Sequence, residues 1–270
     1  MNVAMFPGQG AQFVGMGKDL YNQHPLAQEK FNSANRLLGF SITDIMFEGD
    51  TEALKETKVT QPAIFLHSVI IYELAKKSNP DMAAGHSLGE FSALTACGAL
   101  SFEDGLSLVS KRAQVMQAAC DVTKGTMAAV LALADEVVEQ VCRDMDGVVV
   151  AANYNCPGQI VISGEKDKVI SAVEASKGRG FKLVKPLNVA GAYHSQLMNS
   201  AKEAFASFIE PFEFQSPQCS VFTNVTGAAI REPQAIKDAL VQQIVSSVRF
   251  QDCLQNAHQS LGVSKFIESF

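Results

Sequence analysis

Residues 84–96 read AGHSLGEFSALTA, and this stretch decides the fold. It places Ser87 between Gly85 and Gly89, after a short apolar run and before an apolar helix. A serine at a tight strand-to-helix turn has a strained backbone, needs flanking glycines where a Cβ would clash, and projects its hydroxyl from the sheet edge. The helix that follows adds free N–H groups and a positive dipole end, which stabilise an oxyanion. The stretch predicts a nucleophile elbow for covalent acyl chemistry; the alternative is an ordinary glycine-flanked turn.

The composition predicts a folded, soluble protein without a nucleic-acid partner. At 270 residues and 47% hydrophobic content, the chain can bury a large core, enough for one large domain with or without a subdomain. A net charge of −6 and a pI near 5.4 argue against nucleic-acid binding. No apolar segment approaches the roughly 18 residues of a membrane span, and no basic stretch with an apolar run opens the chain. We expect a cytoplasmic protein with no membrane partner.

The six cysteines show no metal-binding or disulfide pattern. No pair has C-x-x-C spacing and none stands at ligand spacing from a histidine, so we expect neither a metal site nor a disulfide framework. Free buried thiols in a reducing cytosol fit best. The six are Cys97, Cys120, Cys142, Cys156, Cys219 and Cys253.

A glycine-rich loop at residues 7–12 follows a short apolar strand at Val3–Phe6. This is where α/β proteins place ligand contacts. A dinucleotide fingerprint would need glycine at Phe13, and a phosphate loop at Gly17-Lys18 would need glycine at Gln12 and Ser or Thr at Asp19. The loop therefore argues against nucleotide binding.

Three helices are expected around the elbow. One begins at Pro25 and ends near Gly39, and a second begins at Thr60-Gln61-Pro62 and runs through Leu74. Residues 101–104 form a capping box for a third, long helix through Met116, which carries Arg112.

From about Thr123 the pattern changes to a βαββαβ order, which is typical of a small ferredoxin-like unit. Its expected elements are a strand at 127–133, a helix at 135–145, strands at 148–152 and 159–163, a helix at 166–177 and a strand at 181–186. After it come a helix to about Ile209, a strand at 220–223, helices at 233–246 and 251–262, and a strand at 263–267.

The predicted fold class is α/β, with an α/β-hydrolase-like large domain built on a parallel sheet and an inserted ferredoxin-like α+β subdomain. The large domain would comprise residues 1–122 and 190–270, and the inserted subdomain residues 123–189.

A nucleophilic serine needs a base, and His194 is the best candidate. His86 adjoins Ser87 and cannot curl back onto it, His24 precedes a helix-starting proline, and His67 and His258 lie within expected helices. His194 lies where the inserted unit ends, before a helix, in a loop that can direct its side chain at the elbow. The alternative is a helix-capping or surface histidine, and spacing identifies no acidic partner.

These motifs together resemble the malonyl-CoA:acyl-carrier-protein transacylases. Their Gly-Gln-Gly-x-Gln loop appears at residues 8–12, their Gly-His-Ser-Leu-Gly-Glu elbow at 85–90 and their arginine at Arg112. Their Asn-x-Asn-x-Pro-Gly-Gln segment appears at 153–159, their Gly-Ala-Phe-His segment at 191–194 and their late glutamine at Gln243. The motifs stand in family order along nearly the whole chain.

The resemblance implies a ping-pong acyl transfer without a cofactor, with the coenzyme A thioester as substrate. Ser87 would be acylated by malonyl-CoA, and His194 would take its proton and then activate the pantetheine thiol of the acyl carrier protein. The main-chain carbonyl of Gln243 would orient His194. The N–H groups of Gln9 and Leu88 would form the oxyanion hole.

The resemblance also implies that Arg112 holds the malonyl carboxylate with two charge-assisted hydrogen bonds, where the alternative is a surface arginine. Tyr193 and Asn155 would line the acyl pocket. Tyr193 replaces the phenylalanine of malonyl-selective members, which leaves rejection of a branched malonyl group open. Relatives continue past the position of Phe270 through a Gly-Pro-Gly turn into a further helix, which leaves open whether the chain is shortened or a natural variant.

A basic docking surface for the acidic carrier protein is expected near the end of the inserted unit. The alternative is a solvated charged face. The candidate residues are Lys177, Arg179, Lys182 and Lys185.

Two other functions remain open at this point. A serine esterase or thioesterase would use the same elbow with water as acceptor, although an arginine reserved for a carboxylate argues against a simple esterase. A silent carrier-binding module is the second, and the presence of both Ser87 and His194 argues against it. The sequence leaves open the pathway, fatty acid or polyketide, and the oligomeric state.

Overall fold

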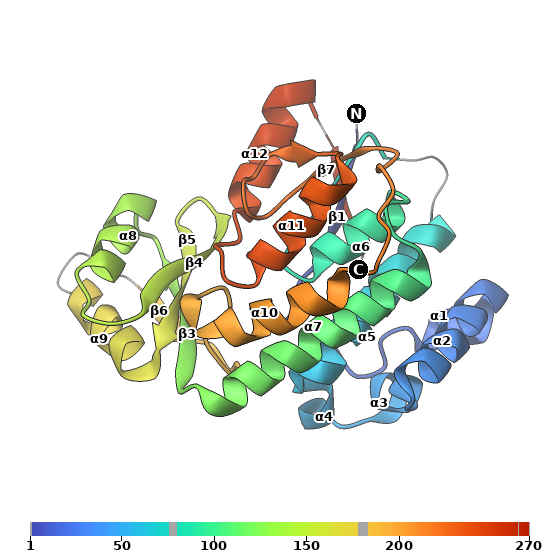
Figure 1. Cartoon of the computed structure of the whole chain (residues 1–270), viewed down its shortest axis with the longest axis horizontal. Helices are drawn as coiled ribbons and strands as arrows, with labels where there is room; N and C mark the ends of the chain where they lie inside the picture. Colours follow the sequence, from blue (N-terminus) through green and yellow to red (C-terminus); the bar gives the residue numbers. More distant parts are fainter. Residues whose placement is uncertain (1, 76–79, 178–182, 264, 270) are drawn as a thin grey trace.

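The computed structural model describes residues 2–75, 80–177, 183–263 and 265–269 (Figure 1). Its main sheet has the strand order β8-β7-β2-β1-β9. Strands β9, β1, β2 and β7 run parallel, and the short β8 pairs antiparallel with β7 at the edge. The bounds are β1 Asn2–Phe6, β2 Met82–Gly85, β7 Ser220–Phe222, β8 Ala229–Ile230 and β9 Lys265–Glu268.

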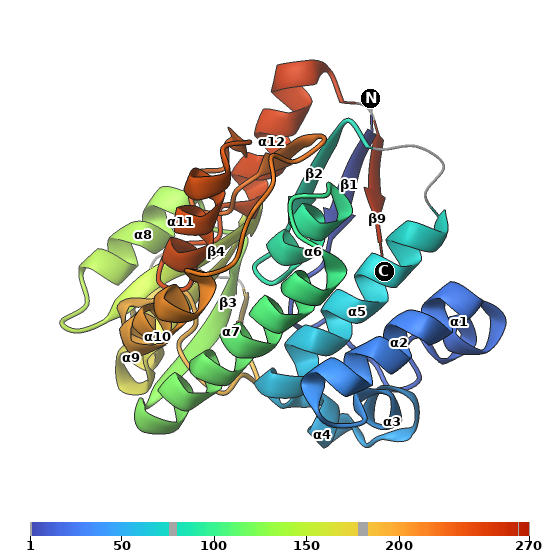
Figure 2. The same ribbon diagram turned by 45° about the vertical axis from the view of Figure 1, so that its right-hand side comes forward.

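Helices cover both faces of this sheet (Figure 2). The alternation of side chains along the strands decides which residues face which helix. Ala4, Phe6 and Ala83 belong to the large core under α5 Thr57–Ala75, α6 Gly89–Ala96 and α7 Phe102–Val122. Val3, Met82 and Ala84 pack instead with α12 Phe250–Leu261. The inner strands β1 and β2 are therefore mostly buried, as a parallel sheet requires, whereas the residues of the edge strand β9 are exposed.

The remaining helices of the main body lie at its edges. The N-terminal group comprises α1 Lys18–Gln23, α2 Pro25–Leu38, α3 Ile42–Glu48 and α4 Thr51–Lys55. The C-terminal group comprises the single turn η1 Gln196–Met198, α10 Asn199–Ile209, which packs on α7, and α11 Pro233–Gln243. Within the described ranges, no helix is both long and apolar enough to span a bilayer.

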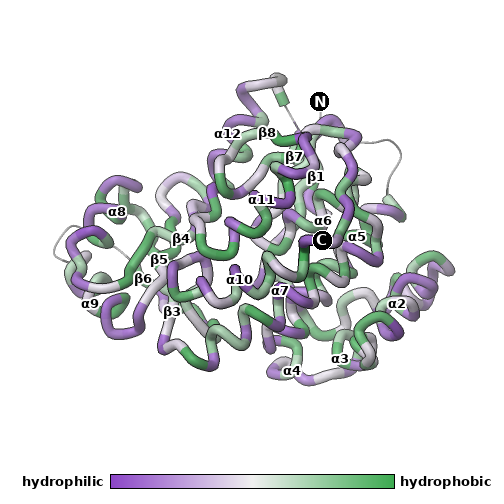
Figure 3. Tube along the Cα trace, in the orientation of Figure 1, coloured by the Kyte–Doolittle hydropathy of each residue, from purple (hydrophilic) through white to green (hydrophobic). Residues whose placement is uncertain are grey.

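The second sheet is antiparallel, with the order β4-β5-β3-β6. Its strands are β3 Gly125–Leu131, β4 Val149–Cys156, β5 Gln159–Glu165 and β6 Leu183–Pro186, and its helices are α8 Asp135–Arg143 and α9 Lys166–Lys177. Along α8 and α9 hydrophilic and hydrophobic stretches follow one another (Figure 3), because each helix packs one face on the sheet and exposes the other. A mixed α/β fold with a parallel sheet and a second, antiparallel sheet is thus confirmed.

Most of the helices and strands expected from the sequence are confirmed, and the differences in their bounds have physical reasons. Helix α5 starts at Thr57 rather than Thr60, so Pro62 lies inside it. The hydrogen bond that Pro62 cannot donate would go to Lys58, an exposed residue where water can replace it. Strand β4 extends to Cys156, past the expected end at 152, and helix α11 ends at Gln243 rather than Ser246. The short elements α1, α3, α4 and β8 had no periodic signal and were not expected.

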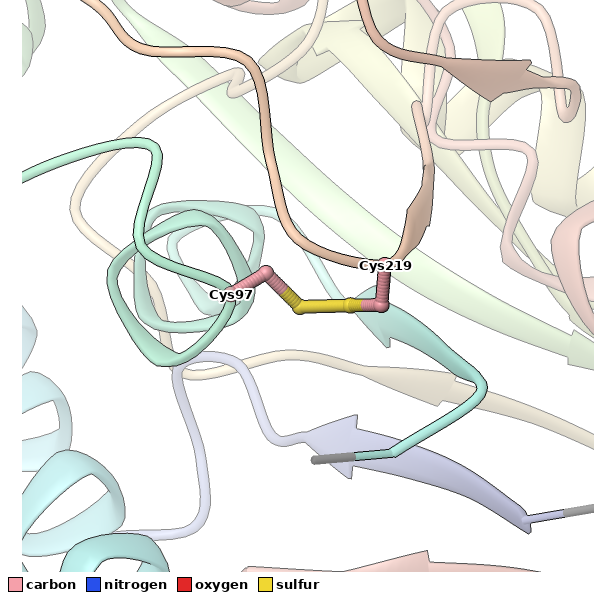
Figure 4. The surroundings of a disulfide bond; sticks show 2 residues. All are labelled: Cys97 and Cys219. Carbon is pink, nitrogen blue, oxygen red and sulfur yellow. A yellow bond between two sulfur atoms is a disulfide. The ribbon is translucent and has the colours of Figure 1, made fainter. Parts of the chain in front are cut away.

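The cysteine expectation is wrong at two points. Cys97, directly after α6, and Cys219, directly before β7, form a disulfide with a Cα–Cα separation of 5.9 Å (Figure 4). Their separation of 122 positions gave no pattern, but the pairing of β7 with β2 brings them together. Cys156 is free but exposed, whereas Cys120, Cys142 and Cys253 are free and buried as expected.

We predict that the native protein, unfolded without reductant, contains four titratable thiols rather than six. Because the bond closes a long loop, its loss should lower the free energy of unfolding by about 2–5 kcal/mol. Thiol titration in denaturant and urea unfolding of Cys219→Ala test both points, with Cys156→Ala as control. Six thiols in freshly purified protein would contradict the disulfide.

Candidate active site

Ser87 lies in the turn between β2 and α6 with φ 55°, a left-handed conformation that is rare for a non-glycine residue. The turn passes so close to its neighbours that a Cβ on Gly85 would overlap the backbone of Gly89, and one on Gly89 would overlap the carbonyl of Phe6. Both glycines of the motif are therefore required sterically. The geometry of a nucleophile elbow is present.

Asn224, two residues after β7, holds this turn from the neighbouring strand. Its Oδ1 accepts a hydrogen bond from the Ser87 N–H at 2.7 Å, and its Nδ2 donates to the Gly85 carbonyl at 2.7 Å. Two buried hydrogen bonds from one side chain stabilise a strained backbone that would otherwise relax.

His194 reaches Ser87 from the loop before η1, also with a positive φ of 57°. Its Nε2 lies 2.8 Å from Ser87 Oγ, and its Nδ1 lies 2.8 Å from the main-chain oxygen of Gln243. A carbonyl oxygen only accepts, so Nδ1 carries the proton and Nε2 is the free base that faces the hydroxyl. His194 is buried, which excludes the surface alternative.

The early end of α11 explains why the Gln243 carbonyl is available. Gln243 is the last residue of that helix, and the last four carbonyls of a helix have no partner within it. The amides of Val245 and Ser246 turn back to Gln242 and leave the Gln243 oxygen to His194.

The surroundings keep this imidazole neutral. Burial and, after it, the nearby Arg112 charge lower the pKa of His194 to about 3, although the hydrogen bond to Gln243 opposes the shift. An imidazole with so low a pKa is in its basic form throughout the neutral range.

We therefore predict that the rate of Ser87 acylation stays nearly constant as the pH falls from 8 to 5. If the base were a histidine with the ordinary pKa near 6.5, half of the rate would be lost at pH 6.5. Because the pKa of His194 is about 3, we expect the rate to fall only near pH 3. Single-turnover acylation by a coenzyme A thioester, followed by intact mass, measures the profile. A midpoint near 6.5 would contradict the prediction.

Arg112, on α7, lies beside the same hydroxyl although it is only 1% exposed. Nη2 donates to Ser87 Oγ and to Gln243 Oε1, both at 2.9 Å, and Nη1 donates to Gln61 Oε1 at 2.7 Å. Burial lowers the pKa of Arg112 to about 10, and Glu90 opposes this, so the guanidinium stays charged at neutral pH. The surface alternative is wrong.

A pocket of about 160 Å³ opens onto these groups. Gln9 and Leu88 both line it, and within the described part of the chain their backbone N–H groups donate to no protein acceptor. Free amides beside a nucleophile are what an oxyanion hole requires. The other residues that line the pocket include Met116, Met127, Asn153, Asn155, Val161, Leu187, Val189 and Tyr193.

Tyr193 and Asn155 lie where the acyl pocket was expected. The Tyr193 hydroxyl lies 2.7 Å from Thr57 Oγ1, and burial raises the pKa of Tyr193 to about 12, which keeps it protonated. Asn155 Oδ1 lies 2.8 Å from His86 Nε2. The β4 strand that carries Asn155 has two register shifts there, and such bulges redirect side chains next to sites.

The expected docking residues are not brought into this site by the described structure. Arg179 and Lys182 lie outside the described residues, and Lys177 ends α9 with its side chain outside them. Lys185 is exposed on β6. Their docking role stays a prediction.

Sequence reasoning missed three residues of the network: Asn224, Glu90 and Gln61. Asn224 had a usable signal, because polar residues just past a buried parallel strand meet at the carboxyl edge of the sheet. Glu90 lies within the elbow motif itself, and Gln61 lies in the interior of α5, 1% exposed. Within the described chain, no group of three histidine, cysteine or acidic residues could hold a metal ion.

A serine at an elbow, a neutral imidazole beside it and two free amides around one pocket are the arrangement expected of an acyl-transfer enzyme. Residues 3–268 match the acyl transferase domain family, and the chain belongs to that family. It is 42% identical over 267 residues to a malonyl CoA-acyl carrier protein transacylase of Staphylococcus aureus, covering 98% of this chain and 86% of that protein. The Bacillus subtilis protein of that name is also 42% identical over 269 residues, with 98% and 84% covered.

Solved structures of similar proteins have the same fold as this chain. The acyl carrier protein S-malonyltransferase of Vibrio cholerae superposes with a TM-score of 0.95 at 38% identity, covering 99% of this chain and 89% of that one. A malonyl-transacylase solved in complex with a type II polyketide synthase acyl-carrier protein gives 0.94 at 34% identity, covering 99% and 88%.

Proposed function

We propose that this protein transfers the malonyl group from malonyl-CoA to the pantetheine thiol of an acyl carrier protein through a malonyl-Ser87 intermediate. The observation that carries the proposal is the buried guanidinium of Arg112, 2.9 Å from the nucleophilic oxygen. A charge placed there selects an acyl group that ends in a carboxylate. The names of the relatives support the same substrate and acceptor.

In the first half of the proposed cycle, His194 Nε2 takes the Ser87 proton while Oγ attacks the thioester carbonyl. The amides of Gln9 and Leu88 stabilise the oxyanion, each contributing on the order of 3 kcal/mol in the transition state. The carbon–sulfur bond breaks, and the coenzyme A thiol leaves with the proton from His194.

In the second half, His194 takes the proton of the carrier's pantetheine thiol. The thiolate attacks the malonyl-serine ester, and Ser87 recovers its proton. The Gln243 carbonyl holds the imidazole in one tautomer through both halves. The cycle consumes no metal or other cofactor, and we assign it to the cytoplasm.

We further infer that residues 1–122 and 190–270 form an α/β-hydrolase-like catalytic domain and residues 123–189 an inserted ferredoxin-like subdomain. The order β4-β5-β3-β6, with α8 packed on β4 and α9 on β3 and β5, supports the second assignment. The elbow between a parallel strand and a helix supports the first.

Intact-protein mass spectrometry tests the function directly. With malonyl-CoA alone we expect the mass to rise by one malonyl group, and with holo acyl carrier protein added we expect that group to move to the carrier. Ser87→Ala is the control and should take up nothing. Rapid release of free malonate without transfer would indicate the alternative, a thioesterase with water as acceptor.

The role of Arg112 is tested by comparing two substrates. Arg112→Ala should lower kcat/KM for malonyl transfer at least about a hundredfold more than for acetyl transfer, since two charge-assisted hydrogen bonds contribute about 1.5–3 kcal/mol each. Arg143→Ala, which removes an exposed arginine on α8, is the matched control. Equal losses for both substrates would assign Arg112 a structural role only.

A further inference from the structure

Glu90 is a buried carboxylate for which the proposed cycle has no use. It is only 2% exposed, three residues after Ser87 in the first turn of α6. Its Oε2 accepts hydrogen bonds from the Asn224 N–H at 3.1 Å and from Gln243 Nε2 at 2.7 Å. A charge so deeply buried is costly unless it is paired or hydrogen-bonded, so its partners define its role.

The Gln243 side chain connects Glu90 to Arg112. Nε2 donates to Glu90 and, at 3.0 Å, to the Ser87 carbonyl, while Oε1 accepts from Arg112 Nη2 at 2.9 Å. Nε2 also donates to Asn224 Oδ1 at 3.3 Å, so turning the amide over would place its oxygen against three acceptors and its NH₂ against a cation. These neighbours therefore determine the orientation of the Gln243 amide. Among the groups that accept from its Nε2, Glu90 is the charged one.

Glu90 and Arg112 also balance one another electrostatically across that amide. Burial raises the pKa of Glu90, and the hydrogen bonds from Asn224 and Gln243 and the Arg112 charge oppose the rise. Glu90 in turn opposes the lowering of the Arg112 pKa by burial. In the described structure no side chain forms a direct ion pair with Arg112. Glu90 therefore compensates the Arg112 charge through the side chain of Gln243, which bonds to both.

We propose that Glu90 is the positioning residue of the malonyl carboxylate site: through Gln243 it holds Arg112 at Ser87 and balances the guanidinium charge until a substrate carboxylate arrives. The inference rests on the proposed function, and it assigns acyl selectivity to a residue that does not touch the acyl group. A residue that only shaped the elbow would affect all acyl groups alike.

The Glu90→Gln variant separates the effect of the Glu90 charge from its effect on the position of Arg112. The glutamine oxygen can still accept from Asn224 and Gln243, so Arg112 stays in place, but the counter-charge is lost. We expect the KM for malonyl-CoA to fall at least about threefold, because the guanidinium then attracts the substrate carboxylate more strongly. The KM for acetyl-CoA should stay unchanged.

Glu90→Ala removes the acceptor with the shortest hydrogen bond to Gln243 Nε2, so the Gln243 amide is held less firmly against Arg112. We expect the ratio of malonyl to acetyl kcat/KM to fall at least about tenfold. In a Gln243→Ala background, which keeps the main-chain carbonyl for His194, the same change should alter the ratio less than about twofold, because the connection is already broken.

Ser92→Ala, a buried serine on α6 outside this network, is the matched control and should keep the wild-type ratio. Equal factors for malonyl and acetyl in both Glu90 variants would overturn the inference while wild-type malonyl loading upholds the function. Wild-type protein that takes no malonyl group would overturn both. If Glu90→Ala does not fold, the KM values of Glu90→Gln decide alone, with a fall expected for malonyl-CoA and no change for acetyl-CoA.

Discussion

Burying the charge of Arg112 is the constraint on which the arrangement of the site depends. A guanidinium with 1% exposure needs protein acceptors in place of water. The acceptors of its two Nη groups come from three distant segments: Gln61 on α5, Ser87 at the elbow and Gln243 at the end of α11. Each acceptor is thereby fixed relative to the nucleophile. The cation is thus an organising centre of the polar core as well as a candidate ligand for a carboxylate.

The same groups carry strain in the backbone. Ser87 and His194 both adopt positive φ, which costs of order 1–3 kcal/mol at each position. Asn224 offsets the cost at Ser87 with two hydrogen bonds, and the Gln243 carbonyl holds the imidazole of His194. Ser87 Oγ and His194 Nε2 lie 2.8 Å apart, so the surrounding fold already holds the proposed catalytic pair within hydrogen-bond distance.

Much of what the sequence predicted was local, whereas two features that it missed, Asn224 and the disulfide, depend on pairing between strands. The elbow follows from adjacent glycines, and the capping box at Ser101 begins α7 as expected. Asn224 reaches the elbow only because β7 pairs with β2 in the register Ala84↔Phe222, which no spacing encodes. The Cys97–Cys219 disulfide has the same origin. Gln243 was identified only through the resemblance to the family, because its contact with His194 depends on where α11 ends.

The pocket wall is attached to the elbow by a short segment after α11. Val248 exchanges backbone hydrogen bonds with β4, donating to Ala152 at 2.8 Å and accepting from Tyr154 at 2.9 Å, and the Arg249 N–H donates to the Asn224 carbonyl at 2.9 Å. The pairing covers the edge of the antiparallel sheet and leaves Asn155, one residue further, in the pocket. Because Asn224 also holds Ser87, the distance between the wall and the nucleophile is determined by consecutive hydrogen bonds rather than by a loose loop. In the proposed function, a pocket built this way would present a fixed wall on one side of the acyl group and the Arg112 charge on the other.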